Sequence, residues 1–273
     1  MTMNEIITQF EYAVEDFNNE FDYNFDADNF VIQGINVGPD REKIFEDFCT
    51  KYFPFRLNDN YKCDEYYLFI ASAFPGKKVT DKQGILVRTD IEWDEKKIYH
   101  IMLHELAHIY CVHNELDGKI FYDEYCEDYA KDMETDGQIN AGYMVWREYI
   151  ADMLTCECED AEVSYLYEKF GVLSSLKRGI DRATGKVIIS KMLFEIMSSA
   201  DVLKTNTWEE AKQSIIDLEL FDFPAYIDMF ELVFCKFKSG SIKIDVDFIM
   251  RLGFLYLEIV TFSDIVGVAQ KLK

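Results

Sequence analysis

Hydrophobic residues in the first part of the chain recur every three or four positions, the spacing that places them on one face of an α-helix. This pattern predicts a helix over residues 4–21 and a second helix over residues 40–52, which ends before Pro54. The stretch between them is rich in Asp, Asn and Gly, so we predict a loop there with one short strand at residues 30–33. We therefore expect residues 1–60 to form an N-terminal helical extension.

Two strands are predicted next, at residues 66–74 and 84–91, and we expect them to pair antiparallel. The first is apolar and aromatic and is followed by Pro75-Gly76. The second alternates in part between apolar and polar side chains, which is typical of a strand with one exposed face or at the edge of a sheet. We therefore predict an edge strand that comprises Gly84, Ile85, Leu86, Val87, Arg88, Thr89 and Asp90.

The pattern of residues 94–114 predicts a helix with apolar side chains on nearly every side and with Asp94 as its N-cap. At about 100° per residue, two apolar sectors of this helix are formed by Ile98, Met102, Leu103, Leu106, Ala107, Ile109 and Tyr110. The remaining sector holds His104, Glu105 and His108. Polar side chains therefore occupy one narrow strip of a helix that is otherwise suited to a core.

The rest of the chain is predicted to be mostly helical. We interpret a strongly acidic segment at residues 115–136 as a partly helical insertion, and a second important helix covers residues 140–156. Further helices are predicted at residues 162–176, 187–203, 208–218, 223–237 and 245–271. Thr207 and Glu210 are placed as a capping box. The pattern indicates an α+β fold, with a core at residues 61–160 followed by a helical subdomain at residues 161–273.

Composition and charge narrow the range of partners. The chain has 273 residues, with 28 Lys and Arg against 51 Asp and Glu, and a formal net charge of -23. Phosphate backbones and anionic lipids repel such a protein, so we expect no nucleic-acid and no membrane partner. The seven cysteines are irregularly spaced, which indicates reduced thiols. Because the start does not resemble a secretory signal and no apolar run reaches about 18 residues, we expect a cytoplasmic protein.

The polar strip has the sequence His104-Glu105-Leu106-Ala107-His108. Residues four apart lie on one face of a helix, so both imidazoles can bind the same metal ion while Glu105 stands beside them. Polar groups buried in such a helix require partners, and a metal ion would satisfy all three. We predict Zn²⁺ at this place, with a third protein ligand from elsewhere and an open position for a water that Glu105 deprotonates.

A third ligand is available on the helix predicted at residues 140–156. Glu148 and Asp152 lie four apart there, so Glu148 can bind the metal while Asp152 accepts a hydrogen bond from a ligand histidine. A carboxylate behind an imidazole fixes the tautomer of the ring and raises its basicity. The rival third ligands lie in the acidic segment, and they are Asp123, Glu124 and Glu127.

The remaining histidines and one pair of cysteines are assigned to other roles. His113 lies about 140° round the helix from His108, so we expect it to face away from the metal. His100 precedes the motif by one turn; it could line the cleft, but we interpret it as a surface histidine. Cys156-Glu157-Cys158 could suggest a second metal site, but it has no accompanying Cys-x-x-Cys pair, so we interpret both cysteines as buried or incidental.

His-Glu-x-x-His followed by Glu148-Tyr-Ile-Ala-Asp152 resembles the gluzincin group of zinc metallopeptidases. The resemblance covers roughly residues 66–159 and implies a zincin-like fold: a small twisted antiparallel or mixed sheet, a metal-binding helix and a glutamate-ligand helix. It also implies that an edge strand of the sheet binds the substrate in extended form. The motif, Glu148 and Ala151-Asp152 are similar as well to the small intracellular peptidases of the ImmA/IrrE type.

The predicted activity is hydrolysis of a peptide or protein substrate by an activated water, with Glu105 as the general base. Because all four histidines lie between residues 100 and 113, the candidate oxyanion donors are Tyr143, Arg147 and Tyr149. The alternative is a non-catalytic zincin-fold sensor or adaptor that uses the C-terminal helices for regulation or binding. A metzincin is excluded, because that motif requires Gly at position 111 and His at position 114, where this chain has Cys111 and Asn114.

Overall fold

The computed structural model describes residues 1–54, 69–117, 133–159, 207–217, 224–239 and 244–271. These residues form a mixed α+β structure with a three-stranded sheet and seven α-helices. The chain divides into two compact units, Met1–Asn114 and Glu115–Lys273, which are considered in turn. The acidic stretch at residues 118–132 and the helices predicted at residues 162–176 and 187–203 lie outside the described residues.

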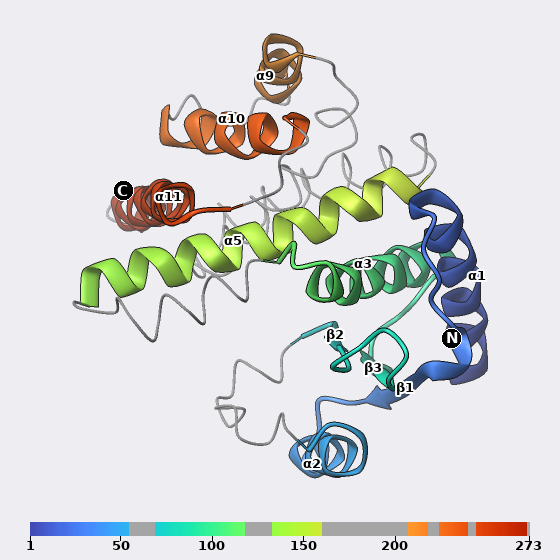
Figure 1. Ribbon diagram of the computed structural model, residues 1–273. Helices are drawn as coiled ribbons and strands as arrows, with labels where there is room; N and C mark the ends of the chain where they lie inside the picture. Colours follow the sequence, from blue (N-terminus) through green and yellow to red (C-terminus); the bar gives the residue numbers. More distant parts are fainter. Residues whose placement is uncertain (55–68, 118–132, 160–206, 218–223, 240–243, 272–273) are drawn as a thin grey trace. The chain divides into compact units, whose positions relative to one another are not determined.

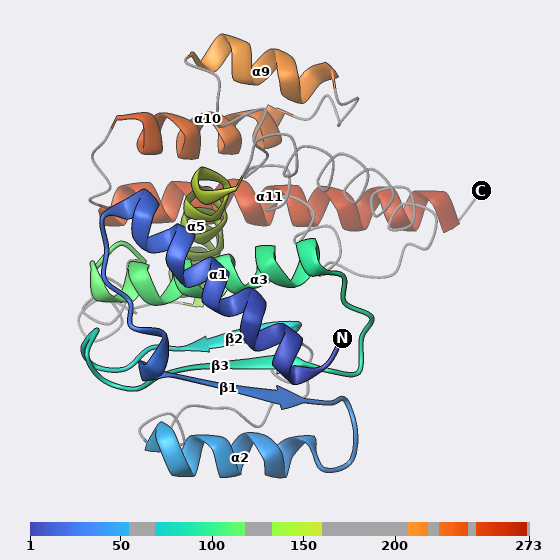
Figure 2. The ribbon, with the colours of Figure 1, turned by 90° about the vertical axis from the view of Figure 1, so that its right-hand side faces the viewer.

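The sheet of the first unit has the strand order β1-β3-β2 (Figure 2). Its strands are β1 (Phe30–Ile35), β2 (Ala71–Phe74) and β3 (Gln83–Arg88). As predicted, β2 and β3 pair antiparallel, whereas β1 pairs parallel to β3. The prediction that residues 84–90 form an edge strand is wrong, because β3 is the central strand and is hydrogen-bonded on both sides.

Both faces of the sheet are covered by helices, which explains why the alternation in β3 was misleading. The helix α2 (Arg41–Tyr52) covers one face of the sheet (Figure 1). Its aromatic rings pack there against Phe74 from β2. The buried members of this cluster are Ile35, Phe45, Phe48, Cys49, Phe53, Phe74 and Leu86. The polar side chain of Arg88 therefore marks the end of a buried strand and not an exposed face.

The opposite face of the sheet is covered by α3 (Glu95–His113) and by α1 (Met3–Phe21), which packs along α3 (Figure 2). Aromatic rings join these elements: the ring centroids of Phe17 and Tyr110 are 5.4 Å apart, and those of Phe10 and Phe30 are 4.9 Å apart. Residues expected to form an N-terminal extension therefore supply one strand and a helix on each face of the sheet. They belong to the same unit as the motif helix.

Local signals in the sequence account for the helix ends. Asp94 caps α3, because its side chain accepts a hydrogen bond of 2.8 Å from the backbone N–H of Lys97, as predicted. In the second unit, the predicted capping box is confirmed. The carboxylate of Glu210 accepts from the N–H of Thr207 at 3.2 Å, and the hydroxyl of Thr207 accepts from the N–H of Glu210 at 3.4 Å.

The described part of the second unit consists of helices (Figure 1). They are α5 (Met133–Cys158), α9 (Trp208–Asp217), α10 (Pro224–Lys238) and α11 (Val246–Lys271). The last three agree with the predicted ranges to within one residue at either end. The helix α5 begins at Met133, seven residues before the predicted start at Asn140, so it includes the end of the acidic segment.

A pair of glycines lets α5 and α11 cross in backbone contact. A Cβ atom on Gly142 would lie 2.0 Å from the carbonyl oxygen of Ile249, and one on Gly253 would lie 1.8 Å from that of Gln138. Real side chains do not tolerate such distances, so both positions require glycine. Beside the crossing, the rings of Trp146 and Phe248 meet edge to face at 5.2 Å. This crossing fixes the helix that carries Glu148 within its unit.

Substitution of Gly142 by Ala tests the crossing. Because the new methyl group would collide with backbone, we expect a loss of about 1–3 kcal/mol or more in the free energy of unfolding, measured by urea denaturation. The matched control is Gly137→Ala on the same helix, where nothing lies within 4 Å of the added Cβ. That variant should gain roughly 0.5–1 kcal/mol, because Ala is the better helix former. Equal stability of the two variants would refute the close crossing.

Candidate metal site

Three polar side chains of the helix α3 lie among buried apolar residues of the same helix. Met102, Leu103, Leu106, Ala107 and Ile109 are fully buried on this helix. Among them, Glu105 is 5% exposed, His108 is 6% exposed and His104 is half-buried. An imidazole or carboxylate placed so deep must exchange its water for hydrogen bonds or for a metal ion. The burial of the motif therefore distinguishes it from the same sequence on an exposed helix.

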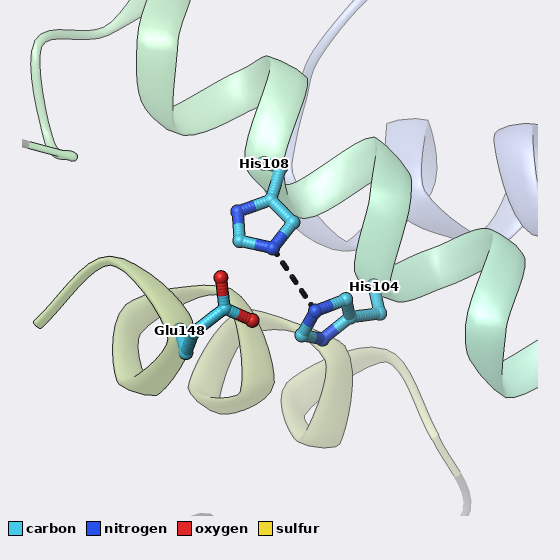
Figure 3. Close-up of side chains that lie close together, drawn as sticks. All are labelled: His104, His108 and Glu148. Carbon is cyan, nitrogen blue, oxygen red and sulfur yellow. Dashed lines mark hydrogen bonds between the residues drawn. The ribbon is translucent and has the colours of Figure 1, made fainter. Parts of the chain in front are cut away.

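The Nε2 atoms of the two imidazoles face one another. His104 Nε2 and His108 Nε2 are 3.0 Å apart, and the ring planes are perpendicular (Figure 3). Two nitrogen ligands that each lie about 2.0–2.1 Å from a tetrahedral Zn²⁺ are separated by roughly 3.3 Å. The spacing of the two Nε2 atoms is therefore close to that of two ligands of one ion.

Glu148 supplies the third donor. One potential ligand atom of each of His104, His108 and Glu148 lies within 4.8 Å of the other two, and Figure 3 shows the Glu148 carboxylate turned toward the imidazoles. The predicted ligands are thus brought together, in a group that could hold a metal ion. Two imidazoles and one carboxylate suit divalent transition metals, and they leave a further coordination position open. The rival ligands Asp123, Glu124 and Glu127 lie outside the described residues.

The remaining members of the predicted site are the general base and the supporting carboxylate. Glu105 follows His104 directly on α3 and is buried, and its role as the general base stays a prediction. Asp152 is half-buried and lies one turn after Glu148 on the same side of α5. Its hydrogen bond to a ligand histidine stays a prediction.

The candidate oxyanion donors on α5 lie on other sides of that helix from Glu148. With 3.6 residues per turn, Arg147 and Tyr149 are each turned about 100° from Glu148, and Tyr143 about 140°. Tyr149 is fully buried, and its hydroxyl has no hydrogen-bond partner among the described residues. Burial raises the pKa of Tyr149, and the nearby acidic groups of Cys156, Asp152 and Cys235 raise it further. The assignment of an oxyanion donor among these three residues stays a prediction.

The other histidines and the cysteine pair are also placed. His113 Nε2 lies 3.2 Å from the side-chain oxygen of Gln83, so His113 is bonded to the start of β3, which agrees with its predicted position away from the metal. His100 is half-buried, although we expected it at the surface. Cys156 is buried and Cys158 half-buried, and no candidate metal group includes them within the described segments.

Comparison of the chain with protein-family models, with curated proteins and with solved structures finds no match. Within the described residues, no helix is both long enough and apolar enough to cross a membrane. The assignment of the site therefore depends on its own chemistry: two converging imidazoles, a carboxylate close to both, and a buried glutamate that follows His104 in the sequence.

Removal of the Glu148 carboxylate tests the ligand set. We expect Glu148→Ala to weaken Zn²⁺ binding by more than about 100-fold, which exceeds the effect of losing a residue that merely supports a ligand. The dissociation constant can be measured by competition with a chelating dye. Glu157→Ala removes an exposed carboxylate from the same helix and should bind Zn²⁺ like the wild type. Unchanged affinity in Glu148→Ala would mean that another residue is the third ligand.

Proposed function

We propose that this protein is a zinc-dependent peptidase, with Zn²⁺ held by His104, His108 and Glu148 and with Glu105 as the general base. The observation that carries the proposal is the His-His-Glu group, whose ligand atoms lie within 4.8 Å of one another. Two histidines and a glutamate are the protein ligands of several catalytic zinc sites. The resemblance of the motif to gluzincins supports the same assignment.

The residues of α3 and α5 divide the chemistry between them. A Zn²⁺ ion at this place supplies Lewis acidity toward water and toward the scissile carbonyl group. The carboxylate of Glu105 accepts a proton from the attacking water, whose oxygen forms a bond to the carbonyl carbon. The C–N bond then breaks, and Glu105 passes the proton to the departing amine nitrogen. Asp152 would orient a ligand imidazole and raise its basicity.

Both β1 and β2 are edge strands of the described sheet, and we assign the extended substrate to β2 because the motif helix α3 packs against that strand. Within the described residues, β2 is an edge strand with a partner only on its β3 side. The N–H of Arg88 donates to the carbonyl oxygen of Ile70 at 2.9 Å, so the hydrogen-bonded pairs of this ladder alternate from Ile70 through Ser72 to Phe74. The backbone groups of the intervening residues, Ala71 and Ala73, therefore point away from β3.

Ala71 and Ala73 are thus the positions at which a peptide would add to the sheet as a further strand. Their side chains lie on the same face as those of Ile85 and Val87, opposite the face that Phe74 shares with α2. The motif helix α3 also packs against β2. A peptide bound along β2 would therefore be held beside the helix that carries the metal ligands and Glu105.

The substitution Glu105→Gln tests the role of the general base. The amide cannot accept the proton of water, so we expect the turnover of a fluorogenic peptide library to fall by about 10²–10⁴-fold, with Zn²⁺ still bound. Glu95→Gln makes the same chemical change at an exposed position in the first turn of α3 and should retain activity. Equal cleavage by wild type and Glu105→Gln would refute the catalytic assignment. A wild-type protein that binds Zn²⁺ and cleaves nothing would favour a non-catalytic binding protein.

The substitution Ala73→Pro tests the binding strand. Proline removes the N–H that points to the open edge, and the N–H groups of Ser72 and Phe74 remain in the ladder with β3, so the sheet should persist. We expect KM for an extended peptide to rise by about tenfold, the effect of losing one hydrogen bond of about 1.4 kcal/mol. Ala73→Val keeps the N–H and should leave KM within about twofold of the wild type. A similar KM for both variants would exclude β2 as the binding strand.

A further inference from the structure

The side chain of Gln83, at the start of β3, organises the connection between β2 and β3. Gln83 is fully buried, and its oxygen Oε1 accepts a hydrogen bond of 2.6 Å from the N–H of Gly76. Its nitrogen Nε2 donates to the carbonyl oxygens of Lys78 at 2.8 Å and Asp81 at 3.0 Å. The connection that leaves the edge strand is therefore bonded along its length to a single amide.

These bonds fix which way the amide of Gln83 points. In the opposite orientation, an NH₂ group would face the N–H of Gly76, and an oxygen would face two carbonyl oxygens. The Oε1 atom also lies 3.2 Å from Nε2 of His113. Because Oε1 can only accept, Nε2 of His113 must carry the hydrogen and donate to it. The tautomer of His113 follows from this network.

His113 is the last residue of α3, so this bond ties the helix of the metal ligands to the connection that follows the edge strand. Burial lowers the pKa of His113, and the nearby carboxylate of Asp81 opposes that change. Protonation would add a hydrogen at Nδ1 and leave the donor at Nε2 in place. The tie between α3 and Gln83 therefore does not depend on the charge of His113, which favours a positioning role.

The distance from His113 to the metal ligands is short along the helix. His113 lies five positions after His108, which is about 7.5 Å along the helix axis. The other end of the tie is Gly76, two residues after the last residue of β2. The bond between His113 and Gln83 thus connects two elements whose relative position would decide how a bound peptide meets Glu105.

We propose that Gln83 and His113 are positioning residues that hold the edge strand β2 in a fixed position relative to α3. This inference rests on the proposed peptidase function, because the position of β2 relative to α3 affects the reaction only if a peptide pairs with Ala71 and Ala73. A displacement of about 1 Å between reacting groups can reduce a rate by roughly 100-fold. A tie of this kind therefore affects the reaction without contact with the substrate.

The test compares His113→Phe, which retains a ring and removes the donor, with His113→Gln, which restores an N–H donor. For a peptide long enough to pair with β2, kcat per bound Zn²⁺ should fall about 10- to 100-fold in His113→Phe. It should recover to within about threefold of the wild type in His113→Gln. A dipeptide substrate, which is too short to pair with the strand, should be cleaved equally by all three proteins. Equal losses for long and short substrates would overturn the proposal, as would a failure of His113→Gln to recover.

Hydrogen exchange separates this inference from the peptidase proposal. In Zn²⁺-loaded protein, the amides of residues 71–76 should exchange about tenfold faster in His113→Phe than in the wild type, and His113→Gln should restore their protection. This measurement needs no turnover, so it remains informative if the wild type cleaves no peptide. Unchanged exchange would show that His113 does not hold the strand, whatever the catalytic activity. Absence of turnover together with faster exchange would refute only the peptidase function.

Discussion

The burial of two imidazoles and a carboxylate in an apolar helix is the constraint on which this structure depends. His104, Glu105 and His108 lie among fully buried hydrophobic residues of α3, where their access to water is limited. A metal ion between two ring nitrogens that are already 3.0 Å apart, with Glu148 as a further donor, meets that demand.

Around this helix, the first unit is built to support one short strand. An aromatic cluster between α2 and the sheet covers one face of the sheet. On the other face, α1 packs against α3. As a result, β3 is enclosed and β2 is left with one unpaired edge among the described strands. The network around Gln83 then fixes the end of β2 to the end of α3. In the second unit, the close crossing at Gly142 holds the helix that carries Glu148.

The errors of prediction have a common physical origin. The partial alternation in β3 was interpreted as evidence for an edge strand, but helices cover both faces of the sheet, and neighbouring strands supply the pairing on both sides. The strand order β1-β3-β2 also differs from the order of the strands along the chain. Order along the chain is therefore a poor guide to proximity in space.

By itself, the sequence determined the features that depend on short-range spacing: the helical periods, the N-cap at Asp94, the capping box at Thr207 and the pair of imidazoles four residues apart. It also singled out Glu148, which lies with His104 and His108 in a group that could hold a metal ion. Only the tertiary structure decided the strand order, the need for glycine at position 142 and the partner of His113. These depend on contacts between distant segments, which local hydrophobic patterns do not specify.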